Sequence, residues 1–355
     1  MSNISQIDPN FKVGTRLKEE GIRFYDVKQP PFRIYGVFYQ DGKFRRLPER
    51  VAKSVSDAVH HLHAHTAGGR VRFRTDSPYV AIHSKMQNIT KMPHFTLAGS
   101  AGFDLYTSDG DERYVKTFMP PYDLEDGYES VITFDTPGMH EVTINFPLYS
   151  EVSALYIGLH EDAFVGEGKP YKPGKPIVYY GSSITQGGCA SRPGNAYESI
   201  ISRRLNVDHI NLGFSGSAKA EDEIAQYIAR LDMSVFVYDY DHNAPTVEYL
   251  KKTHEKMFRA IRETHPNLPI VMMSMPKYYL TEVEETRRAV IETTYRNAIQ
   301  NGDRNVYFLD GKMLMALAGN DGTVDNCHPT DLGFMSMAKA VGDVLFEILK
   351  KVKIS

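Results

Sequence analysis

The chain has 355 residues, 41 basic and 44 acidic side chains, a formal net charge of −3 and 42% hydrophobic residues. This length allows about two domains with separate cores, and the balanced charge excludes any electrostatic argument for nucleic acid or an anionic membrane as a partner. The start of the chain is polar, and no stretch approaches the roughly 20 apolar residues of a membrane span. We therefore expect a cytoplasmic protein.

Residues 1–165 are predicted to form an all-β domain. Short runs of β-branched and aromatic residues alternate there with turn-forming residues, and no helical period separates them. This pattern predicts a jelly-roll-like β-sandwich. Glycine, proline and lysine then crowd together in residues 166–175, which predicts a linker.

Residues 176–355 alternate between strand and helix patterns. Compact apolar runs, typical of buried parallel strands, occupy residues 176–181, 209–213, 234–241, 269–276 and 305–311. Segments with helical periodicity lie between them and after the last one. Five strands alternating with helices predict a doubly wound α/β domain with a parallel sheet.

The loops that follow these strands carry the polar residues of interest, because an open parallel sheet binds ligands at the carboxyl ends of its strands. A serine hydroxyl needs a base and a group that orients the base before it becomes a nucleophile. Ser183 follows the first strand, and Asp325 and His328 share the loop after the fifth. Gly216 and Asn243, in the loops after the second and third strands, are suitable oxyanion donors together with the Ser183 N–H.

Four sequence blocks in this order resemble the SGNH (GDSL-type) hydrolases. They are Gly-x-Ser-Ile-Thr from residue 181, Asn-x-Gly-x-Ser-Gly from residue 211, an asparagine loop at 239–245 and Asp-x-x-His-Pro from residue 325. The sequence Gly-Phe-Asp-Leu-Tyr at 102–106 also resembles the motif of the GxDLY branch, in which a β-rich domain precedes the hydrolase. The resemblance implies a flavodoxin-like three-layer hydrolase domain behind an N-terminal β-sandwich.

The resemblance also implies a role for each matched residue. Ser183 is the nucleophile, His328 the general base and Asp325 the carboxylate that orients it. The Ser183 N–H, the Gly216 N–H and the Asn243 amide form the oxyanion hole. The resemblance implies neither a cofactor nor a metal.

Two positions depart from the family pattern. Ser182 stands where many members have aspartate, which removes a charge from the loop but leaves the nucleophile. The third block reads Asp-Tyr-Asp-His-Asn, so an ungapped alignment places His242 at the donor position. Asn243 is preferred because its amide is a neutral donor at every pH.

The predicted function is that of a serine esterase that removes small acyl groups, acetyl in particular, from carbohydrate. Its expected partner is a small-molecule or oligosaccharide ester, and a homo-oligomer is possible. Two alternatives stay open: the acyl-enzyme could pass its acyl group to an acceptor other than water, or the protein could be a non-catalytic glycan-binding module that kept the fold.

Several other side chains invite functional interpretations. Four histidines at positions 60, 61, 63 and 65 suggest a metal site, since strand alternation would place the last three on one face, but no cysteine or carboxylate cluster joins them. Arg192 follows the nucleophile loop and is predicted to contact substrate, with a solvated loop charge as the alternative.

The remaining candidates have simpler interpretations. Ser215 is a competing nucleophile, but its surroundings do not match the Gly-x-Ser-x-Gly elbow, and the loop at Gly181 lacks the lysine of a phosphate-binding loop. Cys189 and Cys327 are too few for a disulfide framework, although one bridge is possible. They are expected to act as small buried hydrophobes and not as catalytic thiols.

Overall fold

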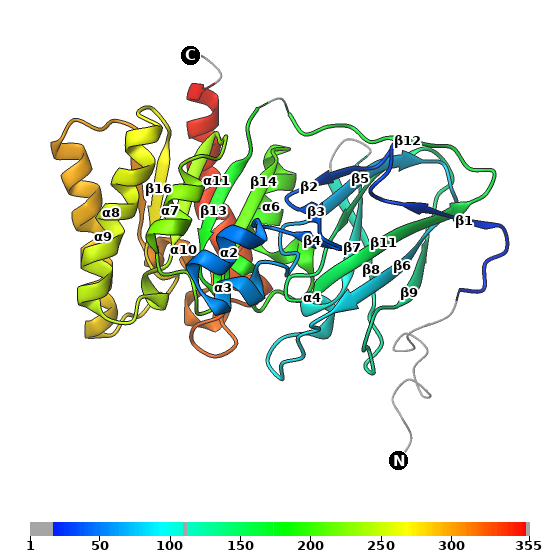
Figure 1. Ribbon diagram of the computed structural model, residues 1–355, viewed down its shortest axis with the longest axis horizontal. Helices are drawn as coiled ribbons and strands as arrows, with labels where there is room; N and C mark the ends of the chain where they lie inside the picture. The colour runs from blue at the N-terminus through cyan, green and yellow to red at the C-terminus, as the bar shows by residue number, and fades with distance from the viewer. Residues whose placement is uncertain (1–16, 109–111, 173, 353–355) are drawn as a thin grey trace.

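The computed structural model describes residues 17–108, 112–172 and 174–352. A β-rich half and an α/β half lie side by side along the long axis of the molecule (Figure 1). Residues 1–16, which carry the polar start of the chain, lie outside the described residues.

The N-terminal half contains two antiparallel sheets that pack face to face. The first holds, in order, β1 (Ile22–Asp26), β11 (Glu151–His160), β6 (Tyr79–Gln87) and β9 (Glu129–Thr133). The second holds β12 (Val165–Glu167), β5 (Arg70–Thr75), β10 (His140–Asn145), β7 (Phe103–Ser108) and β8 (Glu112–Phe118), with β2 (Arg33–Tyr35) also paired to β5. A small hairpin joins β3 (Phe38–Gln40) to β4 (Lys43–Arg45).

Alternation along the strands builds the core between these sheets. On β5, Val71 and Phe73 are completely buried in the core that both sheets share. Arg70, the residue before Val71, points the other way and forms an ion pair with Asp208 of the second half. The predicted β-sandwich is therefore confirmed, and its outer face contacts the other half of the molecule.

The first half is not all β, so that part of the prediction is wrong. It also contains α2 (Glu49–Val55), α3 (Asp57–Leu62) and the single turn α4 (Leu97–Ser100). The apolar residues of α2 and α3 recur at helical spacing and belong to the hydrophobic core of the second half; they include Ala52, Val59 and Leu62. The N-terminal half thus donates two helices to its neighbour, and Figure 1 shows them against the α/β half.

The histidine run lies in the same helical segment. His60 and His61 are in the last turn of α3, and His63 is its C-cap residue. The predicted strand with three histidines on one face is therefore wrong. Burial lowers the pKa of His65 to about 3 and that of His63 to about 4, so both imidazoles are neutral near pH 7.

The second half has the predicted five-stranded parallel sheet. Its order is β14 (His209–Gly213), β13 (Ile177–Gly181), β15 (Val235–Asp239), β16 (Ile270–Met273) and β17 (Val306–Leu309). One face is covered by α7 (Asp222–Ile228), α8 (Val247–Thr264) and α9 (Glu282–Gln300), beside α2 and α3. The other face is covered by α6 (Tyr197–Leu205), α10 (Gly311–Leu314) and α11 (Asp331–Val352). The strand order and the two helical layers confirm the flavodoxin-like three-layer arrangement.

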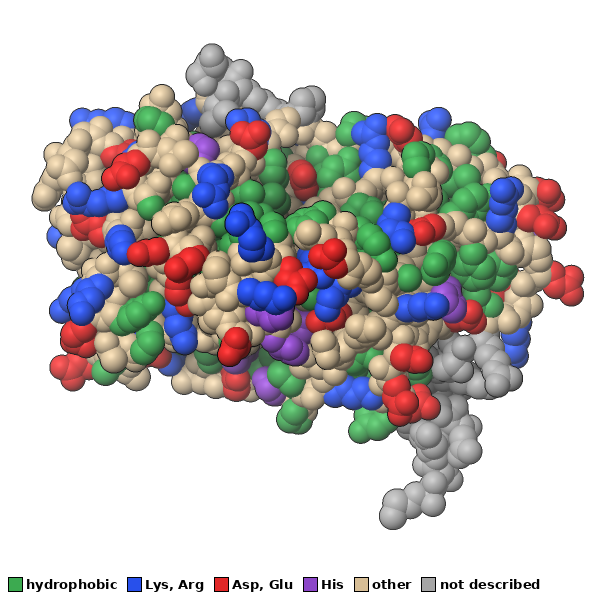
Figure 2. All heavy atoms as spheres, viewed as in Figure 1, with side chains coloured by type: hydrophobic (Ala, Val, Ile, Leu, Met, Phe, Trp, Pro, Cys, Tyr) green, Lys and Arg blue, Asp and Glu red, His purple; other side chains and the backbone are tan. Residues whose placement is uncertain are grey.

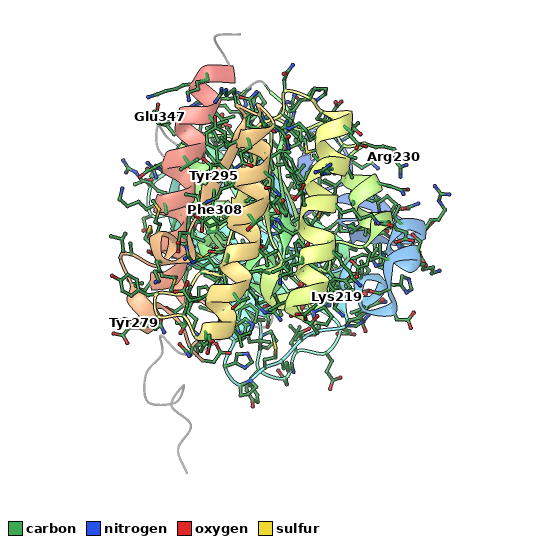
Figure 3. The ribbon with its side chains drawn as sticks, turned by 90° about the vertical axis from the view of Figure 1, so that its left-hand side faces the viewer. Lys219, Arg230, Tyr279, Tyr295, Phe308 and Glu347 are labelled. Atoms are coloured by element: carbon green, nitrogen blue, oxygen red, sulfur yellow. The ribbon has the colours of Figure 1, made fainter. Side chains whose placement is uncertain are left out.

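The helical layer at the far end of the molecule is seen directly in Figure 3, where α8 and α9 face the viewer. Tyr295 of α9 packs on Phe308 of the edge strand β17, with ring centroids 6.1 Å apart. This contact holds α9 against the face of the edge strand that lies farthest from β14 in the sheet.

The connection between the halves begins later than the predicted linker. β12 pairs with β5 as far as Glu167, two residues into the stretch 166–175. Among the described residues between Glu167 and Ile177, none belongs to a helix or a strand.

The surface carries mixed charge. Figure 2 shows basic and acidic side chains interspersed over one face of the molecule, without a continuous basic field. None of the helices that the structure describes combines the length and the apolarity that crossing a membrane demands.

Candidate active site

The turn between β13 and α5 (Ser183–Gln186) presents the predicted nucleophile at the carboxyl end of the sheet. Ser182 is the N-cap of α5 and its hydroxyl accepts a hydrogen bond from the Ile184 N–H at 3.2 Å. Gly181 is required by close approach, because a Cβ there would lie 1.7 Å from Oδ1 of Asp239. The turn therefore holds Ser183 tightly, and only 7% of that residue is exposed.

The structure brings Ser183, His328 and Asp325 together. Ser183 Oγ lies 2.9 Å from His328 Nε2, across 145 positions of sequence. His328 Nδ1 lies 2.7 Å from Asp325 Oδ2, and the His328 backbone N–H donates to Asp325 Oδ1 at 2.7 Å. The carboxylate thus fixes both the ring and the loop that carries it.

The electrostatics of Asp325 suit this arrangement. Partial burial works to raise its pKa, but the hydrogen bonds from the backbone and ring of His328 outweigh that effect and leave the pKa below its ordinary value. Asp325 is therefore ionised at neutral pH and favours the tautomer of His328 with its proton on Nδ1. That tautomer leaves Nε2 free to accept the proton of the Ser183 hydroxyl.

Two backbone N–H groups lie at the predicted oxyanion positions. Gly216 follows β14 and has a positive φ of 63°, which glycine adopts without strain. Within the part of the chain that the structure describes, neither the Ser183 N–H nor the Gly216 N–H has a hydrogen-bond acceptor. Free amides of this kind can bind a developing oxyanion.

The third block contains the 3₁₀ turn η3 (Asp241–Asn243). The Asn243 amide donates to the Phe214 carbonyl at 3.2 Å, which leaves its second N–H available. Both ring nitrogens of His242 are engaged, because Nδ1 lies 2.8 Å from Asp241 Oδ1 and Nε2 lies 3.1 Å from Ser182 Oγ. This geometry favours Asn243 over His242 as the third donor, as predicted from the sequence, but it does not test the role.

The contacts of His242 form a second Asp–His–Ser chain beside the first one, which sequence reasoning missed. The other carboxylate oxygen of Asp241 accepts a hydrogen bond from the Met275 N–H at 3.0 Å. Burial works to lower the pKa of His242, but the Asp241 carboxylate outweighs it and raises the pKa above its ordinary value. The chain ends on Ser182, so it stabilises the residue that precedes the nucleophile.

The N-terminal half also supports the site. The Tyr149 hydroxyl donates to the Ser183 carbonyl at 3.0 Å. Arg46 donates to the carbonyls of Gly213 at 2.6 Å and Asn211 at 3.1 Å, and its guanidinium lies over the Phe214 ring, 4.9 Å from the centroid. No local pattern identifies these residues, because Arg46 lies in the charged stretch Arg-Arg-Leu-Pro-Glu-Arg, typical of a surface.

Arg192 lies in the interface between the halves. Its guanidinium pairs with Asp104 at 2.9 Å, hydrogen-bonds the Tyr106 hydroxyl and lies 3.8 Å from the centroid of the Tyr114 ring. Asp104 and Tyr106 belong to the Gly-Phe-Asp-Leu-Tyr motif, and Asp104 also accepts from the Gly194 N–H at 2.8 Å. The motif therefore binds the loop after the nucleophile, and contact of Arg192 with substrate stays an untested prediction.

The cysteines are unpaired. Burial raises the pKa of Cys189 to about 12 and that of Cys327 to about 11, so both remain protonated at neutral pH and are poor nucleophiles. Ser215 donates its backbone N–H to Gln186 Oε1 at 3.0 Å. The surroundings of Cys189, Cys327 and Ser215 are therefore not those of an activated nucleophile.

Comparisons with known families cover both halves of the chain. The model of the GDSL-like lipase/acylhydrolase family matches residues 174–346, and the GxDLY model, the N-terminus of SGNH-hydrolase-type esterases, matches residues 22–165. No curated protein matches the sequence closely enough to serve as a relative.

Solved structures share the whole architecture. A protein from Bacteroides ovatus described as a GDSL-like lipase is 28% identical with a TM-score of 0.83, over 93% of this chain and 98% of its own. The salicylyl-acyltransferase SsfX3 from a tetracycline biosynthetic pathway is 19% identical with a TM-score of 0.74, over 91% and 96%. A family two carbohydrate esterase from Clostridium thermocellum, in complex with cellohexaose, is 14% identical with a TM-score of 0.60, over 90% and 99%.

These findings define the class of the protein as an SGNH-type hydrolase with an α/β catalytic fold. The chain belongs to the GDSL-like lipase/acylhydrolase family and carries the GxDLY domain at its N-terminus. It is a carboxylic ester hydrolase.

Proposed function

We propose that this protein is a serine esterase that hydrolyses small acyl esters of carbohydrates, acetyl esters above all, through Ser183, His328 and Asp325. The observation that carries the proposal is the continuous hydrogen-bonded chain from Ser183 Oγ through the His328 ring to Asp325, with distances of 2.9 and 2.7 Å. A serine hydroxyl within reach of a base that a carboxylate orients is the arrangement of an activated nucleophile.

The reaction begins with proton transfer from Ser183 to Nε2 of His328 as Oγ attacks the ester carbonyl. The carbonyl oxygen becomes an oxyanion, which the N–H groups of Ser183 and Gly216 and the amide of Asn243 stabilise. His328 then returns the proton to the departing alcohol, which leaves an acyl-serine. A water molecule activated by the same imidazole releases the acid and regenerates Ser183.

The substrate class rests on architecture. A β-sandwich adjoins a hydrolase domain in the carbohydrate esterase with cellohexaose described above, and that protein shares the fold with this chain at 14% identity. Tyr149, which donates to the Ser183 carbonyl, comes from the N-terminal half of this chain, so that half lies close enough to contribute to a sugar site. We also propose that the enzyme acts in the cytoplasm on soluble esters, without a cofactor, and that it could form a homo-oligomer.

Labelling with a fluorophosphonate probe tests the nucleophile directly. The wild-type protein should be labelled on the peptide that contains residue 183 and should hydrolyse an aryl acetate, and Ser183→Ala should lose both properties with a fall in turnover on the order of 10³–10⁶. Ser215→Ala is the matched control, since it removes the competing serine, and it should still be labelled. Labelling that persists in Ser183→Ala would end this assignment.

Acyl transfer is the second candidate function, because the structure of the acyltransferase SsfX3 matches 91% of this chain with a TM-score of 0.74. The same acyl-serine serves both reactions, and the acceptor decides between them. Incubating an acetyl donor with xylo-oligosaccharides and analysing the products separates the two functions. Release of free acetate with no acetylated oligosaccharide supports hydrolysis.

A further inference from the structure

A third side chain able to bind a metal lies beside the catalytic pair. His94 belongs to the N-terminal half, in the loop between β6 and α4, and its ring centroid lies 5.9 Å from that of His328. His94, Asp325 and His328 can each direct one ligand atom toward a common point, with all three atoms within 4.8 Å of one another. In residues 17–108, 112–172 and 174–352, no other group of three such side chains comes as close.

We propose that these three side chains form a binding site for Zn²⁺ and that the ion inhibits the enzyme. The inhibition rests on the proposed function, whereas the binding does not. Two imidazoles and one carboxylate form a common zinc ligand set, and they leave a fourth position for water.

The geometry allows the ion to enter. Zinc binds nitrogen and carboxylate oxygen at about 2.0–2.2 Å, so atoms around a tetrahedral ion lie roughly 3.3 Å apart. The present separations of up to 4.8 Å require movements of about an ångström. His94 and Asp325 are exposed, and side chains at such positions can move this far without disturbing a core.

Binding removes the general base from the reaction. Coordination through Nε2 of His328 occupies the lone pair that would accept the proton from Ser183. Coordination through Nδ1 breaks the 2.7 Å hydrogen bond to Asp325 and leaves the one proton of the neutral ring on Nε2, which then has no lone pair to accept the proton of Ser183. In either mode His328 cannot accept the proton of Ser183, so zinc bound beside the triad inhibits the enzyme.

His94 is the residue that separates this site from the triad. Asp325 and His328 alone supply two ligands, as any Asp–His pair does, and the third ligand comes from the other half of the molecule. Cys327 lies between Asp325 and His328 in sequence, but it is not among the side chains whose ligand atoms converge there. Removing His94 should therefore weaken the metal site while the hydrogen bonds among Ser183, His328 and Asp325 persist.

Calorimetry with zinc chloride tests binding without any need for turnover. Zinc is titrated into full-length Ser183→Ala protein in a buffer that does not chelate metals, and one bound ion is expected. Adding His94→Gln should weaken zinc binding at least about tenfold. Mutating a residue that only hydrogen-bonds a metal ligand already lowers metal affinity by about 10–100-fold, and His94 is itself a ligand. His83→Gln is the matched control, because His83 is a half-buried histidine of the same half that pairs with Glu129.

The enzymatic arm uses the wild type, His94→Gln and His83→Gln with an aryl acetate, each compared with its own rate in the absence of zinc. Zinc should inhibit the wild type and His83→Gln at the same concentration, and EDTA should restore the rate. His94→Gln should need at least about tenfold more zinc, and Mg²⁺ should not inhibit, because it prefers oxygen ligands. Equal zinc affinity with and without His94, or no zinc binding at all, overturns the proposal. An inactive wild type that still binds zinc through His94 counts only against the esterase function.

Discussion

Arg46 offers the sharpest test of how the N-terminal half supports catalysis. Its guanidinium is buried and donates to five oxygens, namely the carbonyls of Leu62, His65, Asn211 and Gly213 and the side-chain oxygen of Asn211. Burial lowers the pKa of Arg46 to about 9, so the group is charged at pH 7. Arg46→Lys keeps the charge and provides only three donors.

The size of the effect follows from the number of hydrogen bonds that are lost. At least two of the five are lost in Arg46→Lys, and each hydrogen bond to a charged donor contributes on the order of 1–3 kcal/mol. The free energy of unfolding should therefore fall by roughly 2–6 kcal/mol. Three of the five hydrogen bonds hold β14 where it leads into the Gly216 loop, so we also expect kcat to fall by up to about 10²-fold, the cost of one oxyanion donor.

Arg45→Lys is the matched control. Arg45 is equally buried, but its partners all lie within the N-terminal half, at Gln40, Glu49 and His63. Urea denaturation measures the stability of both variants, and aryl acetate kinetics measure kcat and KM at a temperature where both are folded. Arg45→Lys should lose stability and keep kcat within about twofold, whereas Arg46→Lys should lose both.

The reasoning is wrong if the folded Arg46→Lys enzyme keeps the kcat of the wild type. It is also wrong if Arg45→Lys lowers kcat to the same extent, because the effect would then reflect general loosening of the N-terminal half. A rise in KM with kcat unchanged would place Arg46 in substrate binding and not in the support of the oxyanion loop.

Three further changes test other parts of the structure. Burial raises the pKa of Asp239 to about 7, so the folded state binds this proton more tightly than the unfolded state does. The free energy of unfolding of the wild type should therefore fall as pH rises from about 4 to 7, by at most about 4 kcal/mol. The difference in Tm between Asp239→Asn and wild type should therefore grow in favour of the variant from pH 5 to pH 8, and a difference independent of pH would contradict this. Ser182→Ala removes the N-cap of α5 and leaves His242 without its hydroxyl partner, so urea denaturation should show a loss of about 2–4 kcal/mol, and a loss under about 0.5 kcal/mol would count against the second Asp–His–Ser chain. Arg192→Met breaks the ion pair to buried Asp104 and should cost about 3–5 kcal/mol, which Asp104→Asn in the same background should partly restore; no restoration would refute the pairing as the cause.

The parallel sheet was predictable because its signal is local. Strands that are buried on both faces need continuous apolar runs, and the run at 209–213 matches β14 residue for residue. The runs at 234–241 and 269–276 extend up to three residues beyond β15 and β16. The additional residues, 240–241 and 274–276, follow the strands and lie in the loops at the carboxyl end of the sheet.

The parts that sequence reasoning missed depend on contacts between distant residues. The helical spacing of Ala52, Val59 and Leu62 is visible in the sequence, but two short helices bury these residues only because the second half provides the surface. Arg46 and Tyr149 show no pattern at all, since each acts through carbonyl groups more than 30 positions away. The triad was predictable because its residue types carry chemistry wherever they lie.

The donation of α2 and α3 limits how this protein can be divided. Without the N-terminal half, the hydrolase half would expose the apolar surface of α7 that those helices cover, including Ile224 and Ile228, and exposed apolar patches of this kind promote aggregation. A recombinant fragment starting near residue 176 should therefore be poorly soluble. Proteolytic cleavage in the connecting segment should instead yield two fragments that copurify. Because α2 and α3 pack on the second half, exchanging N-terminal domains among related enzymes requires exchanging both helices together with the surface that they cover.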